Sequence, residues 1–200
     1  MPRLYDFLPS GNGYKVRLLL TQLGRAFERI ELDILKGETR TPAFLEKNPN
    51  GRIPLLELDN GEFLAESDAI LFYLADGTAF LPSDRFDRAR VLQWMFFEQY
   101  SHEPNIATVR FWMHSEMTDE RRAMLDGKRK LGYAALEVME QHLRGRTFFV
   151  GERYSIADIA LYAYTHVADE GGFDLSGFPI IRCWLERVRE QPRHIPITQG

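Results

Sequence analysis

Hydrophobic and polar positions change their spacing several times in the first third of the chain, which predicts short elements of mixed type. A strand is expected at residues 3–7, and apolar residues then recur at helical spacing over residues 13–23. Gly24 marks a left-handed helix end. Alternation predicts a second strand over residues 27–33, and a short helix with proline in its first turn follows at residues 42–48.

A hairpin and one more helix complete this third of the chain. Strands are predicted over residues 54–59 and 62–65, and the Asn-Gly pair between them is a strong hairpin signal. Residues 67–75 then predict a helix. The expected order is strand, helix, strand, helix, strand, strand, helix, so residues 1–76 predict an α/β domain.

The rest of the chain has a different pattern. Residues 77–84 contain glycine, proline and serine and show little periodicity, which predicts a linker. Residues 85–200 predict an all-α domain. Its helices are expected at residues 86–117 with a break at Pro104, 118–144, 155–168 and 178–189.

Composition limits the partners and the compartment. Of 200 residues, 44% are hydrophobic and 27% are charged, as is usual for a globular protein. A formal net charge of -4 without a Lys/Arg block gives no electrostatic surface for nucleic acid. No apolar run approaches the roughly 20 residues that span a bilayer, and the first residues lack a secretory signal. We therefore expect a cytoplasmic protein that binds neither nucleic acid nor membranes.

Cysteine and histidine usage argues against metal and disulfide chemistry. The single cysteine, Cys183, excludes an intrachain disulfide and a Cys-x-x-Cys motif. Its apolar neighbours in a predicted helix indicate a small buried side chain. The five histidines are scattered, without the spacing of a zinc site, so we expect no bound metal.

Pro54 lies at the start of a predicted strand, just after Gly51 and Arg52. Proline cannot donate to a strand ladder, so it belongs at an edge or an entry. If the Ile53–Pro54 peptide bond is cis, the amide and carbonyl of Ile53 face outward and can pair with an extended peptide. The alternative is a loop followed by an ordinary strand, and this segment alone leaves both interpretations open.

Glu66, Ser67 and Asp68 follow the hairpin and open the next helix. Ser67 fits the N-cap position and Asp68 suits the first turn, so capping alone would explain them. The same amides and hydroxyl can also bind a carboxylate, and Glu66 can pair with an ammonium group. An α-amino acid head group carries both charges.

These segments, together with one near the end of the chain, resemble the cytosolic glutathione transferase superfamily over nearly the whole sequence. The further segment is Tyr-Ser-Ile-Ala-Asp-Ile-Ala at residues 154–160, where Ser155 and Asp158 predict a capping box. The resemblance implies a thioredoxin-like domain at residues 1–76 that binds glutathione. It also implies a homodimer, and a helical domain at residues 85–200 that shapes the pocket for a second, hydrophobic or electrophilic substrate.

The resemblance assigns roles in glutathione binding. It implies a cis bond before Pro54 and hydrogen bonds from the Ile53 backbone to the cysteinyl part of glutathione. It places Glu66 and Ser67 at the γ-glutamyl group. Glutathione acts as a co-substrate in this family, so we expect no metal or nucleotide cofactor.

Basic residues near the same segment are candidates for the glycyl carboxylate. Arg52 lies where related proteins often carry a basic or amide residue. Lys36 and Arg40 are further candidates on the preceding loop. Solvated surface charge is the alternative interpretation for each of the three.

The resemblance also implies a side chain after the first strand that hydrogen-bonds the glutathione sulfur. A free thiol has a pKa near about 8.5, so modest stabilisation of the thiolate raises the reactive fraction. The register is similar to serine-type members, particularly the zeta class, whose Ser-Ser-Cys motif falls on Ser10, Gly11 and Asn12. The second serine and the cysteine are absent here. The register of tyrosine-type members falls on Asp6, so activation by tyrosine is not expected.

Three interpretations of this loop remain open. Ser10 donates its hydroxyl to the thiolate, with the helix N-terminus adding positive potential. Alternatively, Asn12 donates its amide and Ser10 only caps the helix. In the third interpretation both are turn residues, because Ser-Gly-Asn-Gly is typical of turns.

The expected function is therefore glutathione-dependent transfer, in which a bound thiolate attacks an electrophilic carbon, a peroxide or a disulfide. One alternative is a glutathione-dependent isomerase, dehalogenase or disulfide reductase on the same scaffold. A second alternative is a non-catalytic module that binds glutathione, because a fold alone does not fix a function.

Overall fold

A computed structural model describes residues 1–200, and these form two compact units. The first unit comprises Met1–Asp76 together with Pro192–Gly200, and the second comprises Gly77–Gln191. Residues 85–200 were expected to form one helical domain, but Pro192–Gly200 lies with the first unit. Its bonds to residues of that unit, described below, are the physical reason for this difference.

The first unit contains a four-stranded sheet with the order β2-β1-β3-β4. Its strands are β1 (Arg3–Asp6), β2 (Glu28–Glu31), β3 (Leu55–Glu57) and β4 (Phe63–Ala65). β1 runs parallel to β2 and antiparallel to β3, and β3 and β4 form the predicted hairpin. The parallel pair requires a crossover, which a helix between the two strands supplies. The predicted order of elements is confirmed, although the strands are shorter than expected.

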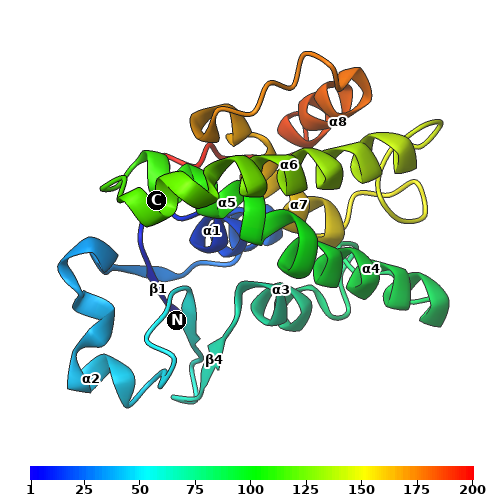
Figure 1. Cartoon of the computed structure of the whole chain (residues 1–200). Helices are drawn as coiled ribbons and strands as arrows, with labels where there is room; N and C mark the ends of the chain where they lie inside the picture. Colours follow the sequence, from blue (N-terminus) through cyan, green and yellow to red (C-terminus); the bar gives the residue numbers. More distant parts are fainter. The chain divides into compact units, whose positions relative to one another are not determined.

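The helices of this unit are α1 (Gly11–Leu23), α2 (Pro42–Leu45) and α3 (Ser67–Ala75), and short 3-10 turns at Ile34–Lys36 and Glu38–Arg40 precede α2. Figure 1 shows these helices in colours from blue to teal. α1 packs against α3 and ends at Gly24, whose φ of 66° gives the expected left-handed stop. α1 begins after a short loop that follows β1, and only Glu66 separates β4 from α3, so the N-termini of these two helices lie near the ends of sheet strands.

The second unit is helical throughout, as predicted. Its helices are α4 (Arg85–Phe97), a π-helical turn (Glu98–His102), α5 (Glu103–Met113), α6 (Asp119–His142), α7 (Ile156–Thr165), a 3-10 turn (Ala168–Gly171) and α8 (Pro179–Arg189). The expected break near Pro104 takes the form of a change of helix type without an interruption: the π-helical turn ends at His102, and Pro104 lies in the first turn of α5. Proline lacks an amide hydrogen, so this is the position in a helix that tolerates it best.

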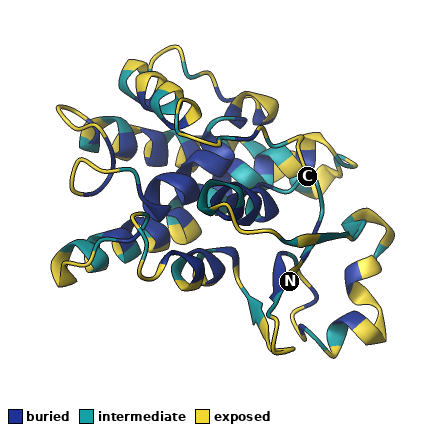
Figure 2. Ribbon diagram, turned by 180° about the vertical axis from the view of Figure 1, so that it is seen from behind, coloured by how far each residue is buried: buried dark blue, intermediate teal, exposed yellow.

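α7 is the centre of this unit, and all of its residues are buried (Figure 2). The predicted capping box is confirmed: Ser155 accepts from the Ala157 amide at 3.3 Å, and Asp158 accepts from the Ser155 amide at 3.0 Å. Asp158 also accepts from the Phe149 amide at 3.2 Å and from Trp184 Nε1 at 3.0 Å. This one carboxylate therefore joins the start of α7 to α8 and to the preceding segment.

The environment of Cys183 differs from the prediction. It is exposed and unpaired in a disulfide, whereas a buried side chain was predicted. The buried face of α8 is formed by Ile181, Trp184 and Val188, which recur at helical spacing. Cys183 lies off that face, so apolar neighbours in the sequence did not imply burial.

Candidate functional site

The loop between β1 and α1 carries the first site residue, Ser10. It is the N-cap of α1, and its hydroxyl oxygen accepts from the Gly13 amide at 3.3 Å. The Ser10 amide itself donates to the Phe7 carbonyl at 2.8 Å, which closes the loop. A hydroxyl that accepts a bond still has its own proton to donate. Ser10 therefore caps the helix, as one interpretation expected, and keeps the chemistry that the other requires.

Asn12 and Ser67 lie together although they are far apart in the sequence. The Ser67 hydroxyl donates to Asn12 Oδ1 at 3.2 Å, and Lys15 Nζ donates to Ser67 Oγ at 3.3 Å. Asn12 is in the first turn of α1 and Ser67 is the first residue of α3. The two helix N-termini thus meet, and the backbone amides of both favour negative charge at this place.

Lys15 is a site residue that the sequence analysis missed. Its side chain is 0% exposed, and Nζ lies 3.2 Å from Asp68 Oδ1 as well as close to Ser67. The ion pair ties the first turn of α3 to α1. The available signal was its spacing: Lys15 lies four residues before Leu19, on the apolar face of the helix.

The start of α3 differs from expectation. Glu66, not Ser67, is the N-cap; its side chain makes no capping bond, and its carbonyl accepts from the Ile70 amide at 2.9 Å. The Ser67 hydroxyl bonds Asn12 and Lys15 instead of an α3 amide. Glu66 has a φ of 68°, in the left-handed region that non-glycine residues rarely adopt. Strain of this kind is concentrated at functional sites.

The segment before β3 has the expected geometry. The Ile53–Pro54 peptide bond is cis. The pairing of β3 with β4 begins at Leu55 opposite Ala65, so the backbone of Ile53 lies outside the ladder. Pro54 precedes Leu55 and Glu66 follows Ala65, so the cis bond and the start of α3 lie at the same end of the β3–β4 ladder.

The basic candidates near this end of the ladder have different environments. Arg52 is exposed, and its carbonyl accepts from Asn48 Nδ2 at 2.8 Å. Arg40 Nη1 donates to the Asn50 carbonyl at 3.0 Å, so it braces the turn. Lys36 is exposed and pairs with Asp33 at 3.0 Å, which raises the pKa of its ammonium group. Arg52 has no such partner and is the best placed of the three.

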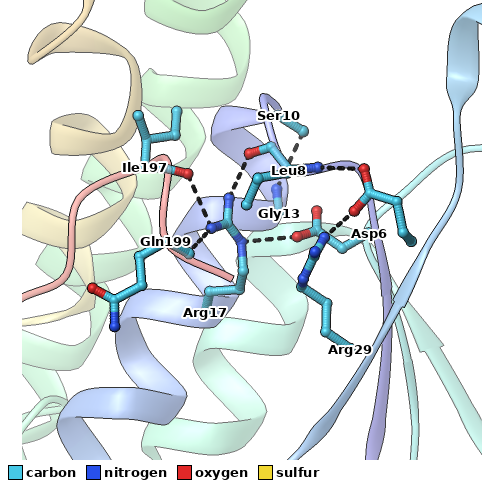
Figure 3. Close-up of polar contacts among 9 residues, drawn as sticks. Asp6, Leu8, Ser10, Gly13, Arg17, Arg29, Ile197 and Gln199 are labelled. Carbon is cyan, nitrogen blue, oxygen red and sulfur yellow. Dashed lines mark hydrogen bonds and ion pairs between the residues drawn. The ribbon is translucent and has the colours of Figure 1, made fainter.

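A buried ion pair lies behind the loop (Figure 3). Arg17 Nε is 2.8 Å from Asp6 Oδ2, and both side chains are 0% exposed. Burial raises the pKa of Asp6 to about 6, and Arg17 opposes that rise. Gly13 makes room for the carboxylate, since a Cβ there would lie 1.5 Å from Asp6 Oδ1. Asp6 thus supports the start of α1 from within and does not face a ligand.

No group of three or more His, Cys, Asp or Glu side chains is arranged to hold a metal ion. None of the helices combines the length and apolarity that crossing a membrane requires.

Comparison with known proteins gives consistent matches for both units. Residues 2–76 match the family model for the glutathione S-transferase N-terminal domain, and residues 97–192 match that for the C-terminal domain. The crystal structure of a glutathione S-transferase from Pseudomonas fluorescens is 55% identical, with a TM-score of 0.96 and 99% of each chain covered. Disulfide-bond oxidoreductase YfcG of Escherichia coli is 32% identical over 193 residues, which are 93% of this chain and 89% of that protein. Ure2p in complex with glutathione is 25% identical, with a TM-score of 0.88 and coverage of 96% and 95%.

Proposed function

The chain belongs to the glutathione S-transferase family, and from this premise we propose that its first unit binds glutathione and stabilises the thiolate. The observation that carries the proposal is the bond between the Ser67 hydroxyl and Asn12 Oδ1, 3.2 Å. It joins the residue expected at the γ-glutamyl group to a residue expected at the sulfur. One ligand that bears an amino acid head and a thiol fits such an arrangement.

Each part of glutathione has a candidate partner. The α3 amides and the Ser67 hydroxyl bind the γ-glutamyl carboxylate, and Glu66 pairs with its ammonium group. The Ile53 amide and carbonyl, outside the ladder, bond the cysteinyl backbone as an added strand would. Arg52 is near the glycyl carboxylate. These contacts fix the tripeptide, so the thiol is presented to the start of α1.

Ser10 donates its hydroxyl to the thiolate, and the α1 amides add positive potential. A charge-assisted bond of this kind is worth about 1.5–3 kcal/mol, which lowers the thiol pKa by roughly one to two units. Asn12 is the rival donor, because its side-chain amide carries N–H groups that can donate to the sulfur, while its Oδ1 accepts from the Ser67 hydroxyl at 3.2 Å.

The thiolate then attacks the second substrate. At an electrophilic carbon, its electron pair forms the new carbon–sulfur bond while the leaving group departs with its own pair. At a disulfide, it forms a mixed disulfide and releases the other sulfur as a thiolate. At a hydroperoxide, it attacks one oxygen, the O–O bond breaks and the alcohol leaves, which gives a sulfenic acid. The thiol of a second glutathione then forms a disulfide with this sulfur and water is released. No metal or nucleotide takes part in any of these steps.

Two alternatives remain on the same fold. The similarity to disulfide-bond oxidoreductase YfcG supports the disulfide reaction as an alternative to transfer to carbon, and an isomerase or dehalogenase would use the same thiolate. A module that binds glutathione without turnover is the alternative of a different class. Binding without thiolate formation or turnover on any of these substrates would favour the module.

Calorimetry with reduced glutathione tests the proposal first. Binding at millimolar affinity or better is expected, and ultraviolet absorbance should show a bound thiol pKa below about 8.5. No heat and no thermal shift at several millimolar glutathione would overturn the proposal. Turnover is then compared on a chloronitroarene, a hydroperoxide and a mixed disulfide, so that the reaction class is decided within one assay series.

We also propose that the chain forms a homodimer in the cytoplasm. Large apolar side chains are exposed on both units, among them Phe63 and Tyr73 on the first and Phe86, Phe96 and Tyr100 on the second. An association surface that gathers such side chains into one contiguous patch would bury them. Light scattering coupled to gel filtration should give twice the monomer mass, and a monomer at micromolar concentration would contradict the dimer.

A further inference from the structure

The segment Pro192–Gly200, here called the returning segment, is bound to α1 in the first unit although it follows the helical unit in the chain. Ile195 is buried, and its carbonyl accepts from the Tyr14 hydroxyl at 2.7 Å. The Gln199 amide donates to the Pro196 carbonyl at 3.0 Å, which closes a turn. The turn brings two further carbonyls of the segment to a second side chain of α1.

That side chain is Arg17, and its guanidinium joins three parts of the unit (Figure 3). Nη1 donates to the carbonyl of Ile197 at 3.0 Å and to that of Gln199. Nη2 donates to the Leu8 carbonyl at 2.7 Å, and Nε faces Asp6 at 2.8 Å. A guanidinium is planar and rigid, so it cannot turn towards one partner without moving away from the others.

The position of the Leu8 carbonyl strongly restricts the position of the Ser10 side chain. It belongs to the Leu8–Pro9 peptide unit, which is planar, and the proline ring fixes the next φ. Few soft torsions therefore separate this carbonyl from the Ser10 side chain. The Leu8 amide is held separately by Glu31 Oε1 at 3.1 Å, but that contact is exposed, whereas Arg17 is buried.

We propose that the returning segment sets the position of the Ser10 hydroxyl at the glutathione sulfur. Its carbonyls orient Arg17, Arg17 holds the Leu8 carbonyl, and the Leu8–Pro9 unit places Ser10. This inference rests on the proposed function and deepens it. Arg17 and the returning segment are positioning residues, since they act on the loop and make no contact with the reacting atoms.

The test removes the two carbonyls of the returning segment and leaves the rest. A chain that ends at Pro196 lacks the acceptors of Ile197 and Gln199, while Gln199→Ala in the full-length chain keeps both backbone carbonyls and is the matched control. In the shorter chain, the bound thiol pKa should rise by about one unit and turnover near neutral pH should fall about tenfold. Glutathione affinity should change less than threefold, because its other contacts remain. The control should match the full chain.

A second readout needs no glutathione. The Ser10 amide, bonded to the Phe7 carbonyl, should exchange its hydrogen at least about tenfold faster in the chain that ends at Pro196. If the full chain binds no glutathione, the proposed function fails, and this exchange still decides whether the returning segment holds the loop. Unchanged exchange together with an unchanged thiol pKa would overturn the inference.

Arg17→Lys provides the same test if the shortened chain does not fold. Lysine keeps a positive charge opposite Asp6 but has no fork to reach Leu8 and the returning segment together. The variant should raise the thiol pKa as the shortened chain does. Normal thiol pKa and normal Ser10 exchange in folded Arg17→Lys protein would contradict the inference just as firmly.

Discussion

The N-termini of α1 and α7 have similar capping residues but different roles. Each has a serine N-cap, Ser10 and Ser155, and each has a buried aspartate nearby whose pKa burial raises to about 6. At α7, the third helical residue is Asp158, which completes a capping box, and Ser155 is 1% exposed. At α1, the third helical residue is Gly13, no acid lies in the first turn, and Ser10 is partly exposed.

The position of the aspartate accounts for this difference. Asp158 belongs to the helix it caps and accepts bonds from neutral donors, so the N-terminus of α7 is closed. Asp6 comes from the preceding strand, fills the space that Gly13 leaves, and is paired with Arg17. The α1 amides are therefore left with the positive potential that favours an anion. A closed cap builds the fold, whereas a cap without its own acid leaves a site for a ligand.

Asp158→Ala should have the largest effect on stability. It leaves the Phe149 amide, the Trp184 indole and the Ser155 amide without their acceptor inside the protein. Each unsatisfied donor costs about 1–3 kcal/mol, and removal of a buried charge returns part of this, so the free energy of unfolding should fall by about 2–4 kcal/mol. Urea unfolding followed by tryptophan fluorescence measures it, since all tryptophans lie in the helical unit.

The comparison predicts that this variant leaves the site intact. Glutathione affinity and turnover per folded molecule should stay near normal in Asp158→Ala protein. Asp158→Asn is the control, because its amide oxygen still accepts some of these bonds and the loss should be smaller. A large loss of turnover at unchanged stability would mean that Asp158 has a functional role.

The pH dependence of the helical unit should show the same carboxylate. Burial raises the pKa of Asp158 to about 6 from an ordinary 3.8. Between these pH values the native protein holds a proton that the unfolded chain has released. The contribution of this carboxyl group to the free energy of unfolding is therefore fully present below about pH 3.8 and is lost as the pH rises through about 6. The fall should be about 2–3 kcal/mol. Urea unfolding at several pH values should show it, and Asp158→Asn should flatten the slope; equal slopes would contradict it.

Ser10→Ala should have the opposite profile to Asp158→Ala. The cap bond to Gly13 is worth only about 1 kcal/mol of stability. The lost donor should raise the bound thiol pKa by roughly one to two units and reduce the rate near neutral pH by roughly ten- to a hundredfold. Ultraviolet titration of the bound thiolate measures the shift.

Asn12→Ala is the matched variant for this experiment. If Asn12 is the donor, it abolishes activation while Ser10→Ala is mild. If neither variant shifts the thiol pKa, the backbone amides at the start of α1 are the better explanation. Only Ser10 makes the cap bond, so loss of the α1 cap is expected in Ser10→Ala alone.

Local patterns in the sequence predicted most of the fold. The capping box at Ser155, the hairpin turn before Glu62 and the helix stop at Gly24 each depend on residues within a few positions of one another. Such features are set by backbone geometry and short-range bonds, so a single sequence is sufficient to find them.

The site was predictable only in part, because its contacts are distant in sequence. Ser67 was expected to cap its own helix, but Asn12 and Lys15, which are presented by another helix, take its hydroxyl. No local pattern indicates that the carbonyls of Ile197 and Gln199 reach Arg17. A charged residue on the apolar face of a helix, as at Arg17, was the one sign that a buried partner exists.

Ser67→Ala should have the smallest effect and separates ligand binding from capping. Loss of the hydroxyl should weaken glutathione binding by about 0.5–1.5 kcal/mol, a few-fold to about tenfold in affinity. Because Glu66 is the N-cap, the stability of α3 should change little, and Lys15 keeps its pair with Asp68. Ser67→Thr retains a hydroxyl and should bind nearly as well. Calorimetry gives the affinities, and amide exchange in α3 gives the stability. If Ser67→Ala leaves affinity unchanged but speeds exchange throughout α3, the hydroxyl only holds the two helix N-termini together, and the α3 amides alone bind the carboxylate.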